Sequence, residues 1–504
     1  MSDERAITNE NAPHGPIRSC FPPSPTGMMH VGGARSALFN WLAARATGGQ
    51  FILRIEDTDR TRFNPDAEAS IKDGLRWLGL QWDEGPEVGG PVGPYVQSER
   101  LATYAEWAQW LLDHGRVYED FSPPPPPGAP PTPDKVHPFR RFREMTAAER
   151  ETARAQMREA GRERPALRLK LPLEGAITVH DLIRGPITWQ YKDVPADPVL
   201  LKADGFPTYH LAEVVDDHLM NRNVVLRADE WLPSTPIHAF LFEAFGFTPP
   251  TFCHLPLVTG KDGRKLSKRE GSTALAEYRA RGYLPEALVN YCALLGWSYG
   301  DDIEYFTLAE AAERFRVEDI RPAPSAWDED KLLHINGHYI NHILSLDEFV
   351  ERSLPFLTEA GLLTEEHTPE YIRDVLALEK ERAKLLSEVP QLTEYFFREP
   401  AVDENMVRLL RKYGGEQTNN ILDANFEALG GVNFGDHDAV FAALDRVKDD
   451  FGVKRGVPFM LVRVATTGTD KTPDLGDMLR VFGRTRVNNR LRAALDALAD
   501  SKAP

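Results

Sequence analysis

Short apolar runs and helix-spaced apolar positions alternate in the first part of the chain. Residues 17–21 and 51–55 are apolar-rich, and they flank a segment, 34–46, in which apolar residues recur three to four positions apart before a Gly-Gly pair. The runs are typical of buried strands and the spacing is typical of a helix. The pattern therefore predicts a strand–helix–strand unit. Helical patterns over 71–80 and 101–114 extend this unit to a doubly wound, Rossmann-type α/β domain.

The periodic pattern is interrupted between residues 116 and 204. Residues 123–133 contain eight prolines, which predicts an exposed polyproline-like loop whose role the sequence does not explain. A basic helical pattern over 146–161 follows, and then strand-like runs at 166–171 and 187–191. We expect this range to be an α+β insertion in the Rossmann domain.

Strand patterns nearly vanish after residue 327, where apolar residues recur at helical spacing. This last third is expected to be all-α. The predicted organisation is a disordered tail 1–16, a Rossmann catalytic domain 17–115 with 205–258, the insertion 116–204, a helical connector 259–326 and an all-α region 327–504.

Composition narrows the environment of the protein. The three cysteines, Cys20, Cys253 and Cys292, are far apart and odd in number, which favours a reducing compartment over a disulfide framework or a four-cysteine zinc site. No apolar run is long enough to cross a membrane, and the first 16 residues are too polar for a signal peptide. We expect a cytoplasmic protein that binds no membrane. Nothing in the sequence suggests a subunit interface, so a monomer is expected.

The formal net charge of −17 does not favour a nucleic-acid partner by itself. Phosphate contact is local, however, so clustered basic residues matter more than the charge of the whole chain. Such clusters occur at 140–143 and 480–492. An ordinary solvated surface is the alternative interpretation of both clusters.

Two distant segments carry residues suited to handling phosphate. In the first, 21–33, a proline-rich turn leads into the predicted helix, whose N-terminus offers unpaired backbone N–H groups and a positive dipole end. His30 can donate to a phosphate or ribose oxygen, and Gly32 and Gly33 allow a nucleotide to approach the backbone. In the second, Lys265 and Lys268 lie in a glycine-flanked loop and can neutralise charge that develops on a polyphosphate.

These segments resemble the paired signatures of class I aminoacyl-tRNA synthetases: His-Val-Gly-Gly at 30–33 and Lys-Leu-Ser-Lys-Arg at 265–269. Other segments resemble bacterial glutamyl-tRNA synthetases in particular: 23–27, 32–41, 54–60, 207–212, 214–220 and 230–236. The resemblance covers nearly all residues from Ile17 onward. It implies ATP-dependent attachment of L-glutamate to the 3′ end of tRNA(Glu) through a glutamyl-adenylate. The lack of β-barrel patterning in the last third favours a glutamyl over a glutaminyl enzyme.

The resemblance implies that the insertion 116–204 binds the acceptor end of tRNA, that the connector 259–326 contacts its stem and that the all-α region 327–504 binds its anticodon. It also implies roles for individual residues. ATP, together with Mg²⁺, would be bound by Thr26, His30, Gly32, Gly33, Lys265, Ser267 and Lys268, with His30, Lys265 and Lys268 as the catalytic residues. The amino acid would be bound by Ser24, Glu56, Tyr209, Arg227 and Trp231. The anticodon would contact Arg463, Thr472, Pro473 and Leu475. Arg382 is a further candidate, for reading the third anticodon base. Many relatives have a zinc-binding cysteine cluster where this chain has residues 118–122, which contain no cysteine, so no zinc or other metal site is expected.

Two residues depart from the family pattern in the amino-acid pocket. Relatives carry an arginine at the position of Cys20 and an asparagine at the position of Glu213, so the pocket is expected to be about two charge units more negative. Each unit is worth about 3 kcal/mol at about 5 Å and an effective dielectric constant near 20. Arg18 shares a strand face with Cys20, and one hypothesis is that it partly replaces the missing arginine.

Three functional alternatives follow from the sequence. The first is a glutamate-specific synthetase, and the second is a paralogue whose preferred amino acid is not glutamate. The third is a catalytically weak RNA-binding or regulatory protein that retains the fold. Because drift after loss of catalysis should not spare both Lys265 and Lys268, the third is disfavoured. Whether glutamine tRNA is also charged stays open.

Overall fold

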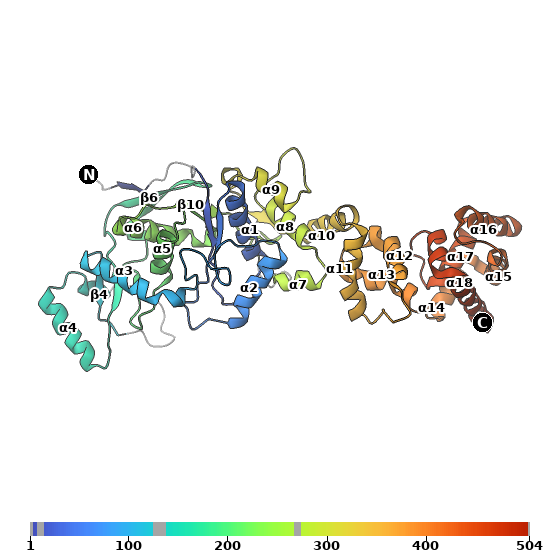
Figure 1. Cartoon of the computed structure of the whole chain (residues 1–504), viewed down its shortest axis with the longest axis horizontal. Coiled ribbons are helices and arrows are strands. Elements are labelled where there is room, and N and C mark those ends of the chain that lie inside the picture. The colour runs from blue at the N-terminus through green and yellow to red at the C-terminus, as the bar shows by residue number, and fades with distance from the viewer. Residues whose placement is uncertain (1–3, 8–14, 124–137, 267–273, 502–504) are drawn as a thin grey trace. The chain divides into compact units, whose positions relative to one another are not determined.

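The computed structural model describes residues 4–7, 15–123, 138–266 and 274–501 (Figure 1). The chain divides into two compact units, Met1–Tyr278 with Pro285–Glu329, and Arg279–Leu284 with Asp330–Pro504. No helix in the described ranges is both long enough and apolar enough to span a bilayer.

The first unit mixes helices and strands, as the doubly wound pattern predicts. Its strands are β1 Glu4–Ile7, β2 Arg18–Phe21, β3 Gln50–Leu53, β4 Val117–Asp120, β5 Ala166–Leu169, β6 Ala176–Asp181, β7 Gly185–Gln190, β8 Val199–Leu201, β9 Val224–Ala228, β10 Thr251–Leu255, β11 Val258–Thr259 and β12 Ser325–Ala326. Its helices are α1 Val31–Ala46, α2 Pro65–Trp77, α3 Leu101–Asp113, α4 Ala147–Glu159, α5 Tyr209–Leu219, α6 Thr235–Phe245, α8 Pro285–Leu294 and α9 Leu308–Arg314. Helix α7 Leu275–Ala280 crosses the division between the two units.

The parallel strands position the site. Strands β2 and β3 pair in parallel, as do β9 and β10. The two pairs lie side by side, because the backbone N–H of Asn223 donates to the Arg18 carbonyl at 3.3 Å. Asn40 of α1 also joins the two pairs. Its side-chain Nδ2 donates to the Leu226 carbonyl of β9, and its backbone carbonyl accepts from Ser19 Oγ of β2. The strands therefore end at one edge, where the N-terminus of α1 also lies.

Strand β6 corrects the predicted domain organisation. Although it lies inside the range assigned to the insertion, it pairs in parallel with β10 and antiparallel with β7, so this hairpin belongs to the sheet of β9 and β10. Alternating apolar residues along β6 and β7 fit either sheet, so the sequence alone could not assign them. The remainder of the range forms a separate antiparallel sheet, β4–β5–β8, together with α4.

The N-terminal residues also differ from the sequence prediction. Residues 4–7, expected to belong to a disordered tail, form β1, which pairs in parallel with β6. The edge of a sheet offers unpaired backbone N–H and C=O groups, so a further strand can pair there even when it is largely polar. Most of the polyproline-like loop, residues 124–133, lies outside the described residues.

Within the described residues of the second unit, all of the regular secondary structure is helical, which confirms the all-α prediction. Its helices are α10 Glu329–His338, α11 Leu346–Glu359, α12 Pro369–Glu379, α13 Val389–Phe397, α14 Glu404–Gly414, α15 Thr418–Leu429, α16 His437–Phe451, α17 Gly456–Thr467 and α18 Leu475–Asp500. Several begin at residues that close the first turn with a side chain, such as Ser345, Thr368 and Asp436.

Candidate active site

A cavity of about 560 Å³ opens where β2, β9 and the N-terminus of α1 meet. The residues that line it include eleven of those predicted from the sequence: Ser24, Thr26, His30, Gly32, Gly33, Glu56, Tyr209, Glu213, Arg227, Trp231 and Lys265. A position at the carboxyl ends of parallel strands is typical of nucleotide sites in α/β sheets. The structure therefore brings residues separated by more than 200 positions into one cavity.

His30 defines the phosphate-binding end of this cavity. It is the N-cap of α1, and its Nδ1 accepts a hydrogen bond from the backbone N–H of Gly33 at 3.0 Å. A neutral imidazole that accepts at Nδ1 carries its proton at Nε2. A Cβ on Gly32 would lie 3.1 Å from His30 Nδ1, so only glycine leaves the capping imidazole this position without crowding. The helix N-terminus and the imidazole together suit an anionic ligand.

The second signature segment returns to the same place. Lys265 lines the cavity and forms an ion pair with Glu230. Ala274 forms an antiparallel bridge with His30, and the backbone N–H of Leu275 donates to the Met29 carbonyl at 2.9 Å. The two segments thus meet at the N-terminus of α1. Ser267 and Lys268 lie outside the described residues.

Arg227, at the end of β9, dominates the opposite end of the cavity. Its Nη1 donates to the Tyr209 hydroxyl at 2.9 Å, its Nη2 to Thr235 Oγ1 at 2.9 Å, and its Nε to His254 Nε2 at 3.0 Å. All these partners are neutral oxygens or imidazole nitrogens. Among the described residues, no carboxylate is paired with Arg227, so its charge is available to a ligand.

His254 and Asp181 hold Arg227 in place, and the sequence analysis did not identify either residue. Asp181 Oδ2 lies 2.6 Å from His254 Nδ1 and accepts from the His254 backbone N–H at 3.0 Å. Burial lowers the pKa of His254 despite the neighbouring carboxylate. The neutral imidazole therefore donates from Nδ1 to Asp181 and accepts at Nε2 from Arg227. In the sequence, the one indication of a role for His254 was its position near the end of a strand that leads to the lysine segment.

Glu56 and Glu213 form the acidic wall of the cavity. Glu213 is buried and is ion-paired with both Arg54 and Arg222, the latter at 2.9 Å. Burial alone would raise the pKa of Glu213, but the two guanidinium groups lower it well below its usual range. Glu56 shares Arg54 at 3.2 Å. Burial, and then the charge of Glu213, raise the pKa of Glu56 well above its usual value. Two guanidinium groups thus compensate Glu213, whereas Glu56 shares Arg54 alone, and its burial favours the neutral carboxyl form.

The structure corrects the pocket charge that is expected from the sequence. Cys20 is not among the residues that line the cavity, and its buried side chain packs with Ile52, Tyr95 and Met220. Arg18 does not line the cavity either, because its guanidinium group pairs with Glu84 at 2.7 Å and donates to the Met220 carbonyl. The structure thus gives no support to Arg18 as a substitute arginine. Glu213 adds no uncompensated charge, because two cations face it.

The predicted anticodon residues gather in the second unit around the loop that precedes α18. Arg463 Nη1 donates to the hydroxyl of Thr472 at 2.6 Å and to its carbonyl at 3.1 Å, and Arg382 Nη2 donates to the Lys471 carbonyl at 3.1 Å. Leu475 is buried at the start of α18. Pro473 is half-buried and lies between Thr472 and the capping residue of this helix. Arg382, Arg463 and Thr472 are therefore close together, although they come from different helices and a loop.

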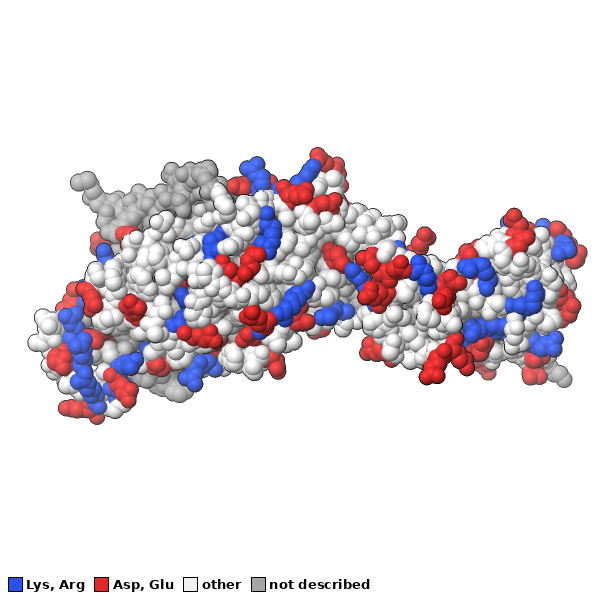
Figure 2. Space-filling model, viewed as in Figure 1, with Lys and Arg blue, Asp and Glu red and all other residues white. Residues whose placement is uncertain are grey.

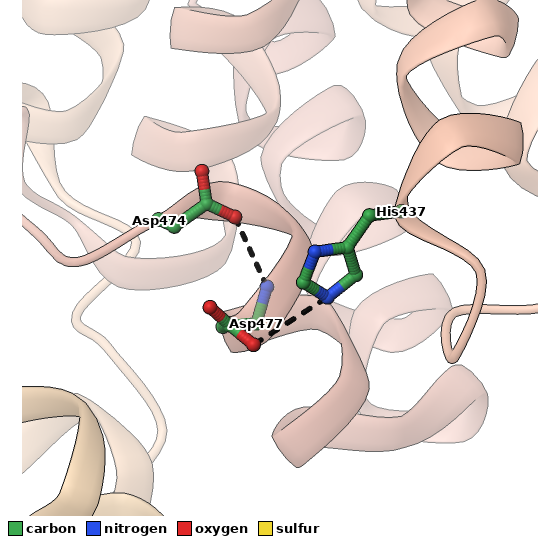
Figure 3. A group of neighbouring side chains, drawn as sticks. All are labelled: His437, Asp474 and Asp477. Carbon is green, nitrogen blue, oxygen red and sulfur yellow. Dashed lines mark hydrogen bonds and ion pairs between the residues drawn. The ribbon is translucent and has the colours of Figure 1, made fainter.

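One group of side chains in the described residues has the composition of a metal site (Figure 3). Asp474 accepts from the backbone N–H of Gly476 at 2.8 Å as the N-cap of α18, and His437 Nε2 lies 3.4 Å from an Asp477 carboxylate oxygen. A helix cap and an exposed ion pair account for this arrangement. The absence of zinc predicted at residues 118–122 stays a prediction, and there the Tyr118 hydroxyl donates to Asp197 at 3.1 Å.

On the face drawn in Figure 2, Lys and Arg lie among Asp and Glu, also over α4, which carries three arginines and three glutamates. Contact with a phosphate backbone would therefore depend on individual basic side chains rather than on one basic face.

Comparisons with known proteins agree with this geometry. The family described as "tRNA synthetases class I (E and Q), catalytic domain" matches residues 16–334, and "Anticodon binding domain" matches residues 348–495. The chain is 43% identical to a glutamate–tRNA ligase of Herpetosiphon aurantiacus, over 96% of this chain and 98% of that protein. It is also 43% identical to one of Thermus thermophilus, over 94% and 98%. A crystal structure of a glutamate tRNA ligase from Elizabethkingia meningosepticum, in complex with its amino acid, is similar with a TM-score of 0.84, 30% identity and coverage of 96% of this chain and 99% of that one.

Proposed function

The chain belongs to the class I tRNA synthetases of the E and Q type, and on that premise we propose that it attaches L-glutamate to tRNA at the expense of ATP. The single observation that carries the proposal is the cavity at the N-terminus of α1. It combines a phosphate-binding end, with His30 and Lys265, and an amino-acid end, with Arg227 and Glu56.

ATP would bind with its phosphates at the N-terminus of α1. Backbone N–H groups, the helix dipole and Nε2 of His30 are suited to the phosphate oxygens. Thr26, Gly32 and Gly33 line the same end, and Lys265 faces it from the second signature segment. Ser267 and Lys268 are proposed to contribute from their place in the sequence alone. Mg²⁺ would be bound mainly by phosphate oxygens of ATP, where it offsets their charge.

Glutamate would bind between Arg227 and Glu56. The Arg227 guanidinium group can pair with the side-chain carboxylate, and Tyr209 and Trp231 border the same space with their rings 4.7 Å apart. The α-ammonium group would lie at Glu56 and Ser24. Because a neighbouring positive charge favours the ionised form of a carboxyl group, a bound ammonium group is expected to lower the raised pKa of Glu56.

The reaction needs positioning and cations rather than a protein nucleophile. The glutamate α-carboxylate would attack the α-phosphate of ATP and release pyrophosphate. The terminal ribose hydroxyl of tRNA would then attack the adenylate and release AMP. Both steps place negative charge on phosphate oxygens, which His30 and the lysines would stabilise.

The tRNA anticodon would be contacted by the second unit. Arg463, Thr472, Pro473 and Leu475 border one short loop, and Arg382 donates to the same loop. Splayed anticodon bases can stack and hydrogen-bond at such a surface. In this proposal the protein acts as a monomer in the cytoplasm and needs no zinc.

The alternatives are distinguished by one experiment. Purified protein is assayed for ATP–pyrophosphate exchange in the presence of total tRNA, with each of the twenty amino acids in turn. We expect exchange to be fastest with glutamate and to depend on His30. Faster exchange with another amino acid would establish a paralogue of altered specificity. No exchange with any amino acid, combined with tight tRNA binding, would favour the regulatory alternative.

A further inference from the structure

Arg222 lies directly behind the acidic wall of the cavity. It belongs to the turn between α5 and β9, and its side chain is fully buried. Its Nη1 donates to Glu213 at 2.9 Å and to Asp217 Oδ1 at 3.1 Å, and its Nη2 donates to the Cys20 carbonyl at 3.3 Å. Arg222 does not line the cavity itself. Of its two ion-pair partners, Glu213 lines the cavity and Asp217 does not, so an effect of Arg222 on a ligand is expected to act mainly through Glu213.

The neighbouring Arg54 cannot balance Glu213 alone. Its Nη2 is shared between Glu213 and Glu56, and its Nη1 donates to Asp217 at 3.0 Å. Arg54 faces four carboxyl groups, those of Glu56, Glu213, Asp216 and Asp217, whereas Arg222 faces Glu213 and Asp217. Removal of Arg222 would leave Arg54, already shared among four carboxyl groups, as the guanidinium group that pairs with Glu213 and Asp217 in the described residues. A buried carboxylate without a partner is costly and affects every charge nearby.

Glu213 is placed to influence the side chain of the substrate. Tyr209 and Glu213 are four residues apart on α5, so they lie on one face of that helix. Tyr209 accepts from Arg227 Nη1, which is the group available to a substrate carboxylate. A net charge on Glu213 would thus oppose Arg227 at the same end of the cavity.

We propose that Arg222 is a specificity-determining positioning residue. By compensating Glu213, it leaves Arg227 as the dominant charge at the side-chain end of the cavity, which then prefers a side-chain carboxylate over an amide. This inference rests on the proposed function, because it assumes that the amino acid binds between Arg227 and Glu56. It explains how the chain can hold Glu213 in this cavity and still select glutamate.

The test compares ATP–pyrophosphate exchange, with tRNA present, for L-glutamate and L-glutamine. Wild type, Arg222→Met, Glu213→Gln and the double variant are assayed. We expect Arg222→Met to lower the glutamate-to-glutamine ratio of kcat/KM by about 10- to 100-fold, an order of magnitude set by one charge at about 5 Å. Adding Glu213→Gln removes the carboxylate that needs compensation, so the double variant should recover the wild-type ratio to within about 3-fold.

Arg490→Met is the matched control. Arg490 is also a buried arginine that pairs with a carboxylate, Glu399 at 2.8 Å, but it belongs to α18 of the second unit. It should lower the unfolding temperature without changing the glutamate-to-glutamine ratio. Arg222→Lys keeps the charge and should retain most of the glutamate preference.

Several results would overturn the inference. A folded Arg222→Met variant with the wild-type ratio would do so, as would Glu213→Gln lowering the ratio as strongly as Arg222→Met does. If Arg222→Met does not fold, the double variant decides: a wild-type ratio supports the inference and a lowered ratio refutes it. Wild-type protein that shows no exchange with glutamate would instead refute the proposed function.

Discussion

Asp181→Asn should weaken glutamate binding although Asp181 is not expected to touch the substrate. Asp181 Oδ1 accepts from the backbone N–H groups of Ile183 and Arg184 at 2.9 Å, and an asparagine carbonyl can retain both bonds. Its Oδ2 accepts from the backbone N–H of His254 and faces Nδ1 of that imidazole. In the variant an amide NH₂ group takes this place, so two donors face each other.

The structure gives the size of the effect. To accept from the new amide, the His254 imidazole must move its proton from Nδ1 to Nε2, where it opposes the Nε–H of Arg227. Arg227 then loses an acceptor 3.0 Å away, in a buried setting. Hydrogen bonds to charged groups contribute about 1.5–3 kcal/mol. At about 1.4 kcal/mol for each factor of ten, the KM for glutamate should rise by roughly 10- to 100-fold.

Exchange kinetics over a range of glutamate and ATP concentrations check this prediction. The KM for ATP should change by less than about 2-fold, because the phosphate end lies at α1. Asp120→Asn is the control, since Asp120 also pairs with a guanidinium group, that of Arg168 at 2.6 Å, but in the β4–β5–β8 sheet. An unchanged KM for glutamate in folded Asp181→Asn, or equal increases for ATP and glutamate, would refute the reasoning.

Three further predictions concern other parts of the structure. His30→Asn should keep the helix cap but lower kcat at least about 10-fold, whereas His30→Ala should also cost about 1 kcal/mol of stability; equal kcat for His30→Asn and wild type would contradict the role of Nε2. Glu56→Gln should abolish exchange yet raise the unfolding temperature of the empty enzyme by about 2–4 °C at neutral pH. Because the pKa of Glu56 is raised in the folded protein, wild type loses stability as the pH rises from the usual glutamate pKa toward that raised value. The stability gained by Glu56→Gln should therefore vanish at low pH. Arg463→Ala should raise the KM for tRNA about 10-fold. Arg455→Ala, which removes an exposed arginine, is the control and should leave this KM unchanged.

The phosphate end could be predicted from the sequence because its determinants are local. A proline-rich turn, a capping histidine and two glycines lie within residues 22–33, and the helix that follows has ordinary apolar spacing. The amino-acid end was only partly predictable. Tyr209, Arg227 and Glu56 are at the cavity, but Asp181 acts on His254 across 73 positions and has no sequence pattern of its own. Only the pairing of β6 with β10 brings the two residues together.

The charge of the pocket shows a second limit. If Cys20 and Glu213 are counted as independent changes of charge, the pocket is expected to repel a carboxylate. In the structure, Arg222 returns from the turn after α5 to meet Glu213, and the burial of Cys20 removes it from the cavity wall. Ion pairs of this kind depend on tertiary contacts. A single sequence shows the charged residues but not which of them neutralise one another.

The assignment of β6 to the catalytic sheet limits how this enzyme can be rebuilt. A designer who treats residues 116–204 as an interchangeable module and grafts another in its place would also remove Asp181, and His254 would lose the acceptor of its ring proton. Excising only the β4–β5–β8 sheet with α4, while retaining Ala176–Gln190, avoids this loss. The portable part of residues 116–204 is therefore discontinuous in the chain, and its junctions lie on either side of one hairpin.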